Sequence, residues 1–263
     1  MLCGFLPQPP SGDIPEGNVL PWRHWEKGAR LVGLDPRHMH TGQKALTRRV
    51  ASKVEQRVLD VGCGVGGLLS MLPESIEAVG VDVSSYCVHR ARSRLEPHEN
   101  TRVINADILD INEEKLGRFS TIVGLDVIHM LDRVRVLKKF SNLLKKKGQF
   151  IFTDCLSDNN HSELFTPFKA KPPLSKKEYE KVTNDSSFDI VSVDDFTEEC
   201  IHETRSVLSK FRREKPKKWI IDKWGEEYYQ YTIHLSHEWD KMMSSGKIKY
   251  ALLTVSKSNC TRI

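Results

Sequence analysis

The stretch Leu59-Asp60-Val61-Gly62-Cys63-Gly64-Val65-Gly66-Gly67 decides the fold of this chain. It begins within a short β-type run at residues 57–61 and precedes an apolar run at residues 68–72, in which we expect a helix to begin. Glycines between a strand and a helix permit a tight turn with positive φ and allow a ligand to approach the backbone closely. Three of them also match the dinucleotide pattern G-x-G-x-x-G, which is a weak signal when it stands alone. The stretch therefore predicts a ligand-binding loop, and the ligand must be inferred from other residues.

Outward from this loop, β-type runs alternate with helical patterns. Further strands are expected at residues 78–82, 102–106, 119–125, 149–154, 188–193 and 247–255. Most connections are too long for hairpins, which predicts an α/β fold with a parallel sheet covered by helices on both faces. In open sheets of this kind, ligands bind at the carboxyl ends of the strands, near the point where the strand order reverses.

Two local predictions concern helices and loops. A helix with Val134, Leu137, Phe140 and Leu144 on one face is expected to end in a basic turn at residues 145–148, with its glycine as the stop signal. The basic run at residues 211–219 is expected to be a solvated loop rather than a contact with RNA.

Three aspartates at the ends of expected strands point to the ligand. Asp82 is placed where a carboxylate can accept hydrogen bonds from a ribose diol. Asp107 is placed to bind the amino group of an adenine, while Ile108 packs on the ring. Asp60 lies two residues before the first glycine, where a carboxylate repels a pyrophosphate and attracts an ammonium group. The set favours S-adenosylmethionine, which carries an adenosine, a sulfonium and an amino acid tail, over the nicotinamide cofactor of a dehydrogenase.

In combination these motifs resemble the class I S-adenosylmethionine-dependent methyltransferases. The resemblance covers residues 57–156 and includes the glycine loop, Gly80-Val81-Asp82-Val83-Ser84, Asn105-Ala106-Asp107-Ile108, Asp126-Val127-Ile128-His129 and residues 143–148. It implies a Rossmann-like, mostly parallel seven-stranded sheet whose last strand, residues 249–255, runs antiparallel. It also implies that Asp60, Gly62 and Gly64 hold the methionine moiety, Asp82 the ribose, and Asp107 with Ile108 the adenine. The expected cofactor-binding set is completed by Cys63, Val83 and Asp126.

We expect a flexible arm at residues 1–20, followed by a single methyltransferase domain at residues 21–263. Segments near residues 21–45 and 199–245 are expected to cover the crevice as lids and to select the substrate. The first contains Thr41-Gly42-Gln43, which is weakly similar to a segment of phosphoethanolamine N-methyltransferases. The second is aromatic and partly basic, and such side chains can hold methylated ammonium groups and phosphates. Alternatively, its aromatic residues at helical spacing form only the buried face of a helix: Tyr228, Tyr231, Leu235 and Trp239.

His129 and Asp154 are the candidate catalytic residues, because each follows or ends an expected strand at the crevice. A histidine has an ordinary pKa near 6.5, which suits the removal of a proton from a hydroxyl or ammonium nucleophile. The alternative is that His129 is structural, as lone histidines usually are. The Pro-Pro-aromatic motif of enzymes that methylate DNA bases or glutamine amides is absent from residues 126–132.

The charge, the apolar stretches and the cysteines of the chain restrict the class of protein to which it can belong. The chain has 40 Lys+Arg, 35 Asp+Glu and a net charge of +5, which is compatible with an anionic substrate and too small to indicate nucleic acid. No stretch approaches the roughly 20 apolar residues that cross a bilayer. The six scattered cysteines predict neither a metal site nor disulfides, and the first residues lack a basic leader, so we expect a cytoplasmic protein.

The sequence thus predicts S-adenosylmethionine-dependent methylation of an amine or hydroxyl of a small molecule. Phosphoethanolamine-like or glycine/sarcosine-like amines are the favoured substrates. An O-methyltransferase of a lipid, quinone or natural product is the alternative enzyme, and a methyltransferase-like binding subunit is the alternative without activity. The sequence leaves the oligomeric state open.

Overall fold

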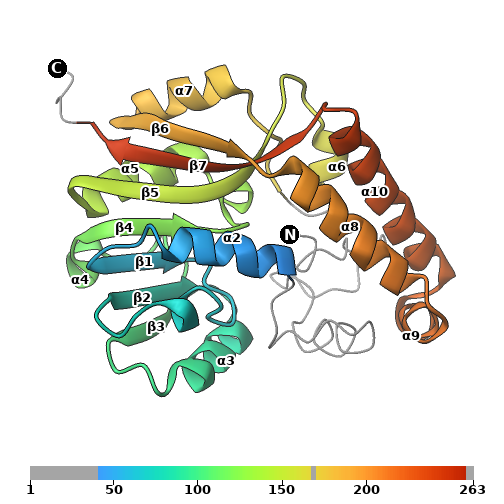
Figure 1. The fold of residues 1–263 in the computed structure, drawn as a ribbon, viewed down its shortest axis with the longest axis horizontal. Helices are drawn as coiled ribbons and strands as arrows, with labels where there is room; N and C mark the ends of the chain where they lie inside the picture. Colours follow the sequence, from blue (N-terminus) through green and yellow to red (C-terminus); the bar gives the residue numbers. More distant parts are fainter. Residues whose placement is uncertain (1–40, 167–169, 259–263) are drawn as a thin grey trace.

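The computed structural model describes residues 41–166 and 170–258 (Figure 1). The expected arm and most of the first expected lid segment, residues 1–40, lie outside the described residues. The described chain contains a seven-stranded sheet in the order β3-β2-β1-β4-β5-β7-β6. Its strands are β1 (Arg57–Val61), β2 (Glu77–Asp82), β3 (Thr101–Asn105), β4 (Phe119–Gly124), β5 (Leu144–Leu156), β6 (Phe188–Asp195) and β7 (Lys249–Lys257).

Strand β7 runs antiparallel to its two neighbours, β5 and β6, whereas the other neighbouring strands are parallel. This is the Rossmann-like sheet with an antiparallel last strand that the resemblance implied, and the expected fold class is confirmed. From β1 the strand order proceeds to β2 and β3 on one side and to β4 and β5 on the other. The order therefore reverses between β1 and β4, which is where sheets of this kind bind ligands.

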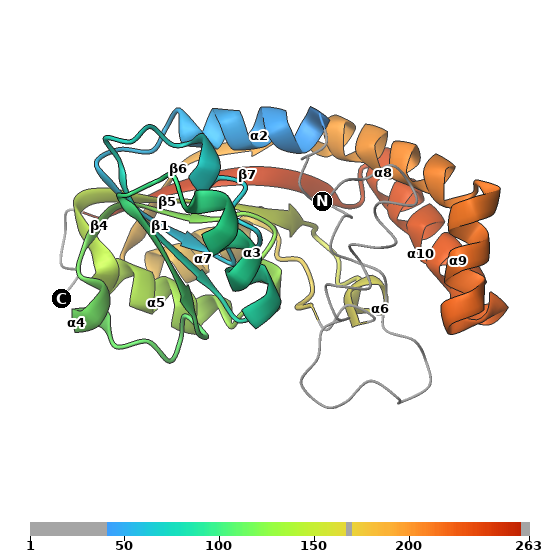
Figure 2. The same ribbon diagram turned by 90° about the horizontal axis from the view of Figure 1, so that it is seen from below.

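Helices cover both faces of the sheet (Figure 2). Apolar residues of α2 (Thr41–Ala51) and α3 (Ser85–Leu95) belong to one buried cluster, and those of α5 (Arg133–Leu143) and α7 (Lys176–Asn184) to another. Successive side chains of a strand point to opposite faces, so Val58 joins the first cluster and the adjacent Leu59 joins the second. Two helices of one turn complete this part of the chain: α4 (Glu113–Leu116) and α6 (Ser162–Phe165).

Three helices are inserted between β6 and β7: α8 (Thr197–Phe211), α9 (Glu214–Trp224) and α10 (Glu226–Ser244). We call them the three-helix insertion. It extends beyond the edge of the sheet at which the parallel strands end (Figure 1). The basic run 211–219 is therefore mostly helical, and the expectation of a loop was wrong. Pro216 does not prevent this helix, because it lies in the first turn of α9, where a backbone N–H has no partner within the helix.

The aromatic residues of α10 mainly pack within the protein. Tyr228, Leu235 and Trp239 are buried, and Tyr231 is partly buried. The ring of Trp239 lies 5.1 Å from that of Phe165 in α6, which ties the insertion to the segment that follows β5. The interpretation of this spacing as a buried helical face is confirmed.

The helix expected after the glycine loop is only one turn of 3-10 helix, Leu69–Met71. The backbone of Leu72 is already extended, with ψ of 143°. Pro73 accounts for this, because a proline disfavours helical geometry in the residue before it. The prediction of a full helix here was wrong.

The end of α5 also differs from the expectation. The helix ends at Leu143, and the three lysines at residues 145–147 belong to β5. Asp132 caps the helix by accepting a hydrogen bond from the Arg135 backbone N–H, and the resulting register buries Val136 and leaves Val134 43% exposed. The glycine of the basic turn is therefore not a helix stop.

Within the described ranges, the longest helices are too short or too polar to pass through a bilayer.

Candidate active site

The glycine loop brings backbone, rather than side chains, to the carboxyl end of β1. Gly62 and Gly64 have φ angles of 68° and 54°, a region that favours glycine. A Cβ atom on Gly62 would lie 2.7 Å from a methyl group of Val127, so only glycine fits there. A Cβ atom on Gly64 would meet no atom within 4 Å, so the loop borders open space on that side. The loop can therefore accept a ligand against its backbone at Gly64.

Asp82 holds the loop in this shape. Its carboxylate accepts hydrogen bonds from the backbone N–H of Gly64 at 2.9 Å and of Ser84 at 2.8 Å. A carboxylate has about four acceptor positions, so these two bonds leave capacity for a diol. Cys63, between the two glycines, is buried with its sulfur against β2, where a Cβ atom on Gly80 would lie 2.9 Å from it. The structure therefore places Cys63 under the loop rather than in the crevice.

Asp60 lies at the base of the same loop and is 3% exposed. Burial and, secondarily, the negative charge of Asp82 raise the pKa of Asp60 to about 8. The group is therefore mostly protonated at neutral pH, and a bound cation would favour its ionised form. A buried acid of this kind fits the ammonium and sulfonium groups of S-adenosylmethionine.

The residues expected around an adenine differ in exposure. Val83 is 65% exposed directly after Asp82, and Asn105 fixes its position by donating a hydrogen bond to the Val83 carbonyl at 2.9 Å. Ile108, by contrast, is buried in the apolar cluster of α5 and α7. Asp107 accepts a hydrogen bond from the Leu109 backbone N–H at 2.8 Å. Contact of these residues with an adenine stays a prediction.

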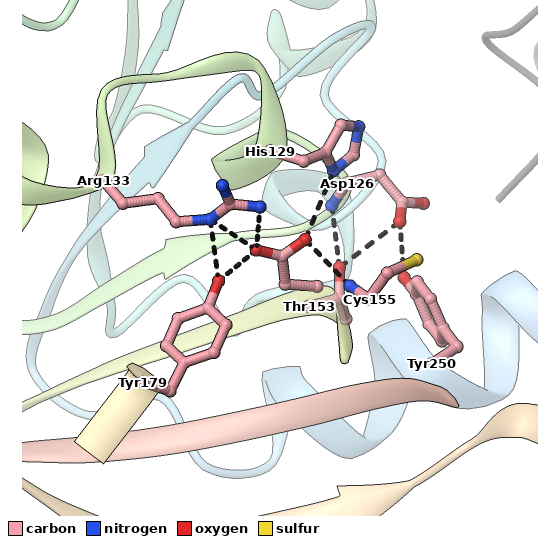
Figure 3. A network of polar contacts seen from close by, with 8 residues as sticks. Asp126, His129, Arg133, Thr153, Cys155, Tyr179 and Tyr250 are labelled. Carbon is pink, nitrogen blue, oxygen red and sulfur yellow. Dashed lines mark hydrogen bonds and ion pairs between the residues drawn. The ribbon is translucent and has the colours of Figure 1, made fainter. Parts of the chain in front are cut away.

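Asp126 follows β4 in a left-handed conformation, with φ of 56°. Its backbone N–H donates to the Thr153 hydroxyl at 2.8 Å, and its carboxylate accepts a hydrogen bond from the Tyr250 hydroxyl (Figure 3). Tyr250 also contacts the start of the three-helix insertion, because its N–H donates to the Thr197 hydroxyl at 3.0 Å and its carbonyl accepts from the Phe196 N–H at 2.8 Å. The structure therefore links Asp126 to the base of the insertion.

His129 and Asp154 are brought together. His129 lies in the 3-10 turn after β4, and its Nδ1 is 3.9 Å from Oδ1 of Asp154, the residue near the end of β5 (Figure 3). His129 is largely buried: burial lowers its pKa, Asp154 and Asp126 raise it, and Arg133 lowers it. The net direction is downward, so the imidazole is neutral at physiological pH and able to accept a proton.

Two residues of this cluster were missed by the sequence analysis. Arg133 donates from Nε to Oδ2 of Asp154 at 3.0 Å, and the Tyr179 hydroxyl donates to the same oxygen. Arg133 begins α5 and Tyr179 lies in α7, separated by 46 residues of the sequence. An isolated arginine and tyrosine carry no motif, so only the tertiary structure identifies them.

Comparisons with known proteins identify the family of this chain. A family model described as "Methyltransferase domain" matches residues 52–232. This chain belongs to that methyltransferase family. The resemblance seen in the motifs is thereby confirmed, and the glycine loop, Asp60, Asp82 and His129 lie inside the matched range.

Curated relatives are more distant. Phosphoethanolamine N-methyltransferase 1 of Triticum aestivum is 24% identical over 237 residues, which cover 84% of this chain and 46% of the relative. Juvenile hormone acid O-methyltransferase of Drosophila melanogaster is 32% identical over 142 residues, which cover 50% of this chain and 47% of the relative. The chain thus spans about half the length of these relatives.

Among solved structures, a mycolic acid cyclopropane synthase complexed with SAH and CTAB superposes with a TM-score of 0.74 at 16% identity, over 90% of this chain and 95% of the other. This likeness shows a shared fold. Within the described ranges, no group of three or more His, Cys, Asp or Glu side chains is arranged to hold a metal ion.

Proposed function

We propose that this chain transfers a methyl group from S-adenosylmethionine to the nitrogen of a small amine, with a phosphoethanolamine-like amine as the favoured substrate and a glycine/sarcosine-like amine as the next choice. The observation that carries methyl transfer with removal of a proton is the His129–Asp154 pair, which is largely buried and lies at the same edge of the sheet as the glycine loop. S-adenosylmethionine, when bound, supplies a methyl group on a positively charged sulfur. The cofactor would be held by Asp60 at its cationic end, by the backbone at Gly64, and by Asp82 at the ribose.

The protein's own contribution is to position the substrate and to accept a proton. Methylation of an amine forms a carbon–nitrogen bond, breaks the bond between the methyl carbon and sulfur, and requires that the amine lose its proton. His129 presents Nδ1 to Asp154 and has Nε2 on the other side of the ring (Figure 3). In the proposed step the amine proton passes to Nε2, and Asp154 stabilises the imidazolium that forms.

The choice of an amine rests on the wheat relative, whose match covers most of this chain. The relative from Drosophila favours the second candidate, methylation of an oxygen, and its match covers half of this chain. A neutral histidine next to a carboxylate serves either nucleophile, so the distinction requires an experiment. A cytoplasmic location and the absence of nucleic acid as a substrate stay predictions.

The test is incubation of the full chain with methyl-labelled S-adenosylmethionine and a panel of amines, phosphorylated amines, phenols and carboxylic acids. We expect label on phosphoethanolamine or a related amine. We also expect His129→Gln to lower kcat by tenfold or more, because one proton-transfer group typically contributes a factor of about 10² to 10⁴. His89→Gln is the matched control, since His89 is exposed on α3.

Label only on hydroxyl or carboxyl groups would replace the first candidate by the second. Binding of the cofactor without transfer to any member of the panel would support a binding subunit. A loss of less than threefold in His129→Gln at saturating substrate would remove His129 from the mechanism.

A further inference from the structure

Asp154 is 1% exposed, and the two oxygens of its carboxylate have different partners. Oδ2 accepts from Arg133 Nε at 3.0 Å, lies 2.9 Å from Arg133 Nη2, and accepts from the Tyr179 hydroxyl. Oδ1 accepts from the Cys155 backbone N–H at 2.8 Å and is the oxygen nearest His129. Oδ2 is therefore anchored by the side chains of Arg133 and Tyr179, while Oδ1 faces His129, the candidate base.

Arg133 is buried as well, so this is an ion pair inside the protein. Such pairs contribute little to net stability, because both charges lose their hydration when they are buried. They need another reason to be present, and the position of this pair behind His129 provides one. Tyr179 is fully buried, and its hydroxyl also lies 3.0 Å from Arg133 Nε, so it contacts both members of the pair.

Within the described ranges, three charged side chains act on the imidazole of His129. Asp154 approaches it from β5, Asp126 from the end of β4 and Arg133 from α5. From the segment before α7, the backbone N–H of Lys171 donates to the His129 carbonyl at 2.6 Å, and the Lys171 side chain is exposed. Without Arg133, two carboxylates would act on a buried imidazole with no positive charge among these partners except the exposed lysine. Burial would still disfavour the protonated imidazole, but the pKa of His129 would lie higher than it does beside Arg133.

We propose that Arg133 and Tyr179 are positioning residues: they hold Asp154 with Oδ1 toward His129, and the charge of Arg133 offsets part of the charge of Asp154 at His129. Asp154 then orients the imidazole and stabilises its protonated form during the reaction without protonating it beforehand. The catalytic consequence rests on the proposed function. The effect on His129 itself does not depend on it.

The test is an NMR titration of His129 in the full chain without substrate, with the signal assigned by its loss in His129→Gln. Arg133→Gln keeps a donor toward Asp154 and removes the positive charge, so we expect the titration midpoint to move to higher pH by about one pH unit. Asp154→Asn removes the negative charge, so we expect a move to lower pH. The double variant has the same net charge as the wild type, and its midpoint should return toward that of the wild type.

Two conservative variants separate charge from shape. Arg133→Lys keeps the charge and should leave the midpoint closer to that of the wild type than Arg133→Gln does. Tyr179→Phe removes one hydrogen bond and no charge, so it should shift the midpoint less than Arg133→Gln while lowering kcat severalfold through misplacement of Asp154. In active protein, the acid limb of the kcat/KM profile should follow the same order.

A purely structural cluster gives another pattern. If Arg133 and Asp154 only support packing, both single variants expose His129 to water and both midpoints move toward the ordinary value near 6.5. Shifts in the same direction for Arg133→Gln and Asp154→Asn, or a double variant that does not return, would overturn the proposal. If Arg133→Gln fails to fold, the test rests on the midpoint of His129 in Asp154→Asn and on its return in the double variant. Because the NMR titration measures no turnover, its results stand even if the methyl acceptor is wrong.

Discussion

Asp60 and Asp154 are both almost completely buried at the same edge of one sheet, yet their surroundings are opposite. The charge that acts on Asp60 within the described residues is that of Asp82, which raises its pKa further after burial has done so. Asp154 has Arg133 and Tyr179 against one of its oxygens. The comparison teaches that a buried acid can obtain its positive partner from the protein or from a ligand. Asp154 has the first arrangement, and Asp60 is suited to the second.

The largest expected effect on stability comes from removal of Arg133, the positive partner of Asp154. Arg133→Met leaves Asp154 buried and unpaired, so we expect the free energy of unfolding to fall by about 3–5 kcal/mol, measured by urea denaturation at pH 7. Asp60→Asn is the matched control and should not lower the stability of the ligand-free protein. If the free energy of unfolding of Arg133→Met falls by less than about 1 kcal/mol, Arg133 is not what stabilises the buried charge of Asp154.

A smaller effect is expected when the protein loses the carboxylate of Asp60, the proposed partner of the cationic ligand. Asp60→Asn should weaken the binding of S-adenosylmethionine by tenfold or more, measured by calorimetry, because a charge-assisted contact contributes about 1.5–3 kcal/mol. Arg133→Gln, which alters the other acid's surroundings, should change this affinity by less than threefold. Unchanged affinity in Asp60→Asn would show that Asp60 does not bind the cofactor's charge.

The most gradual effect, which is spread over several pH units, concerns protonation of Asp60. Its pKa is about 8 in the ligand-free protein against an ordinary value of 3.8, so the folded state holds a proton that the unfolded state has released between these values. The stability of the ligand-free protein should therefore fall as pH rises through this window, by at most about 1.4 kcal/mol per unit, and level off above pH 8. Asp60→Asn should remove this slope.

The same proton links pH to ligand binding. A cationic ligand lowers the pKa of Asp60, so binding below pH 8 releases a proton and affinity should rise with pH up to about 8. Calorimetry in buffers of different ionisation enthalpy measures the released proton. If the affinity of the wild type for S-adenosylmethionine does not change between pH 6 and 8, binding is not coupled to the protonation of Asp60.

Much of the sheet could be predicted because its signals are local. Short β-type runs bounded by glycines and acids predicted all seven strands, including the antiparallel β7 through the family resemblance. Helix boundaries were harder to predict, since they depend on single residues such as Pro73 after the glycine loop and the cap at Asp132. Both residues act over a short range and are visible in the sequence, but the helix predictions followed the periodic spacing of apolar residues instead.

The sequence by itself determined where the residues of the proposed cofactor site lie, because a glycine loop and aspartates at successive strand ends are brought to one edge by any parallel sheet. It also suggested His129 and Asp154 on the same ground. Only the tertiary structure decided what neutralises Asp154, since Arg133 and Tyr179 come from two helices packed on one face of the sheet and no local pattern marks them. The physical reason is that strand order sets where backbone ends meet, whereas the charge inside a buried site depends on side chains that reach it from distant parts of the chain.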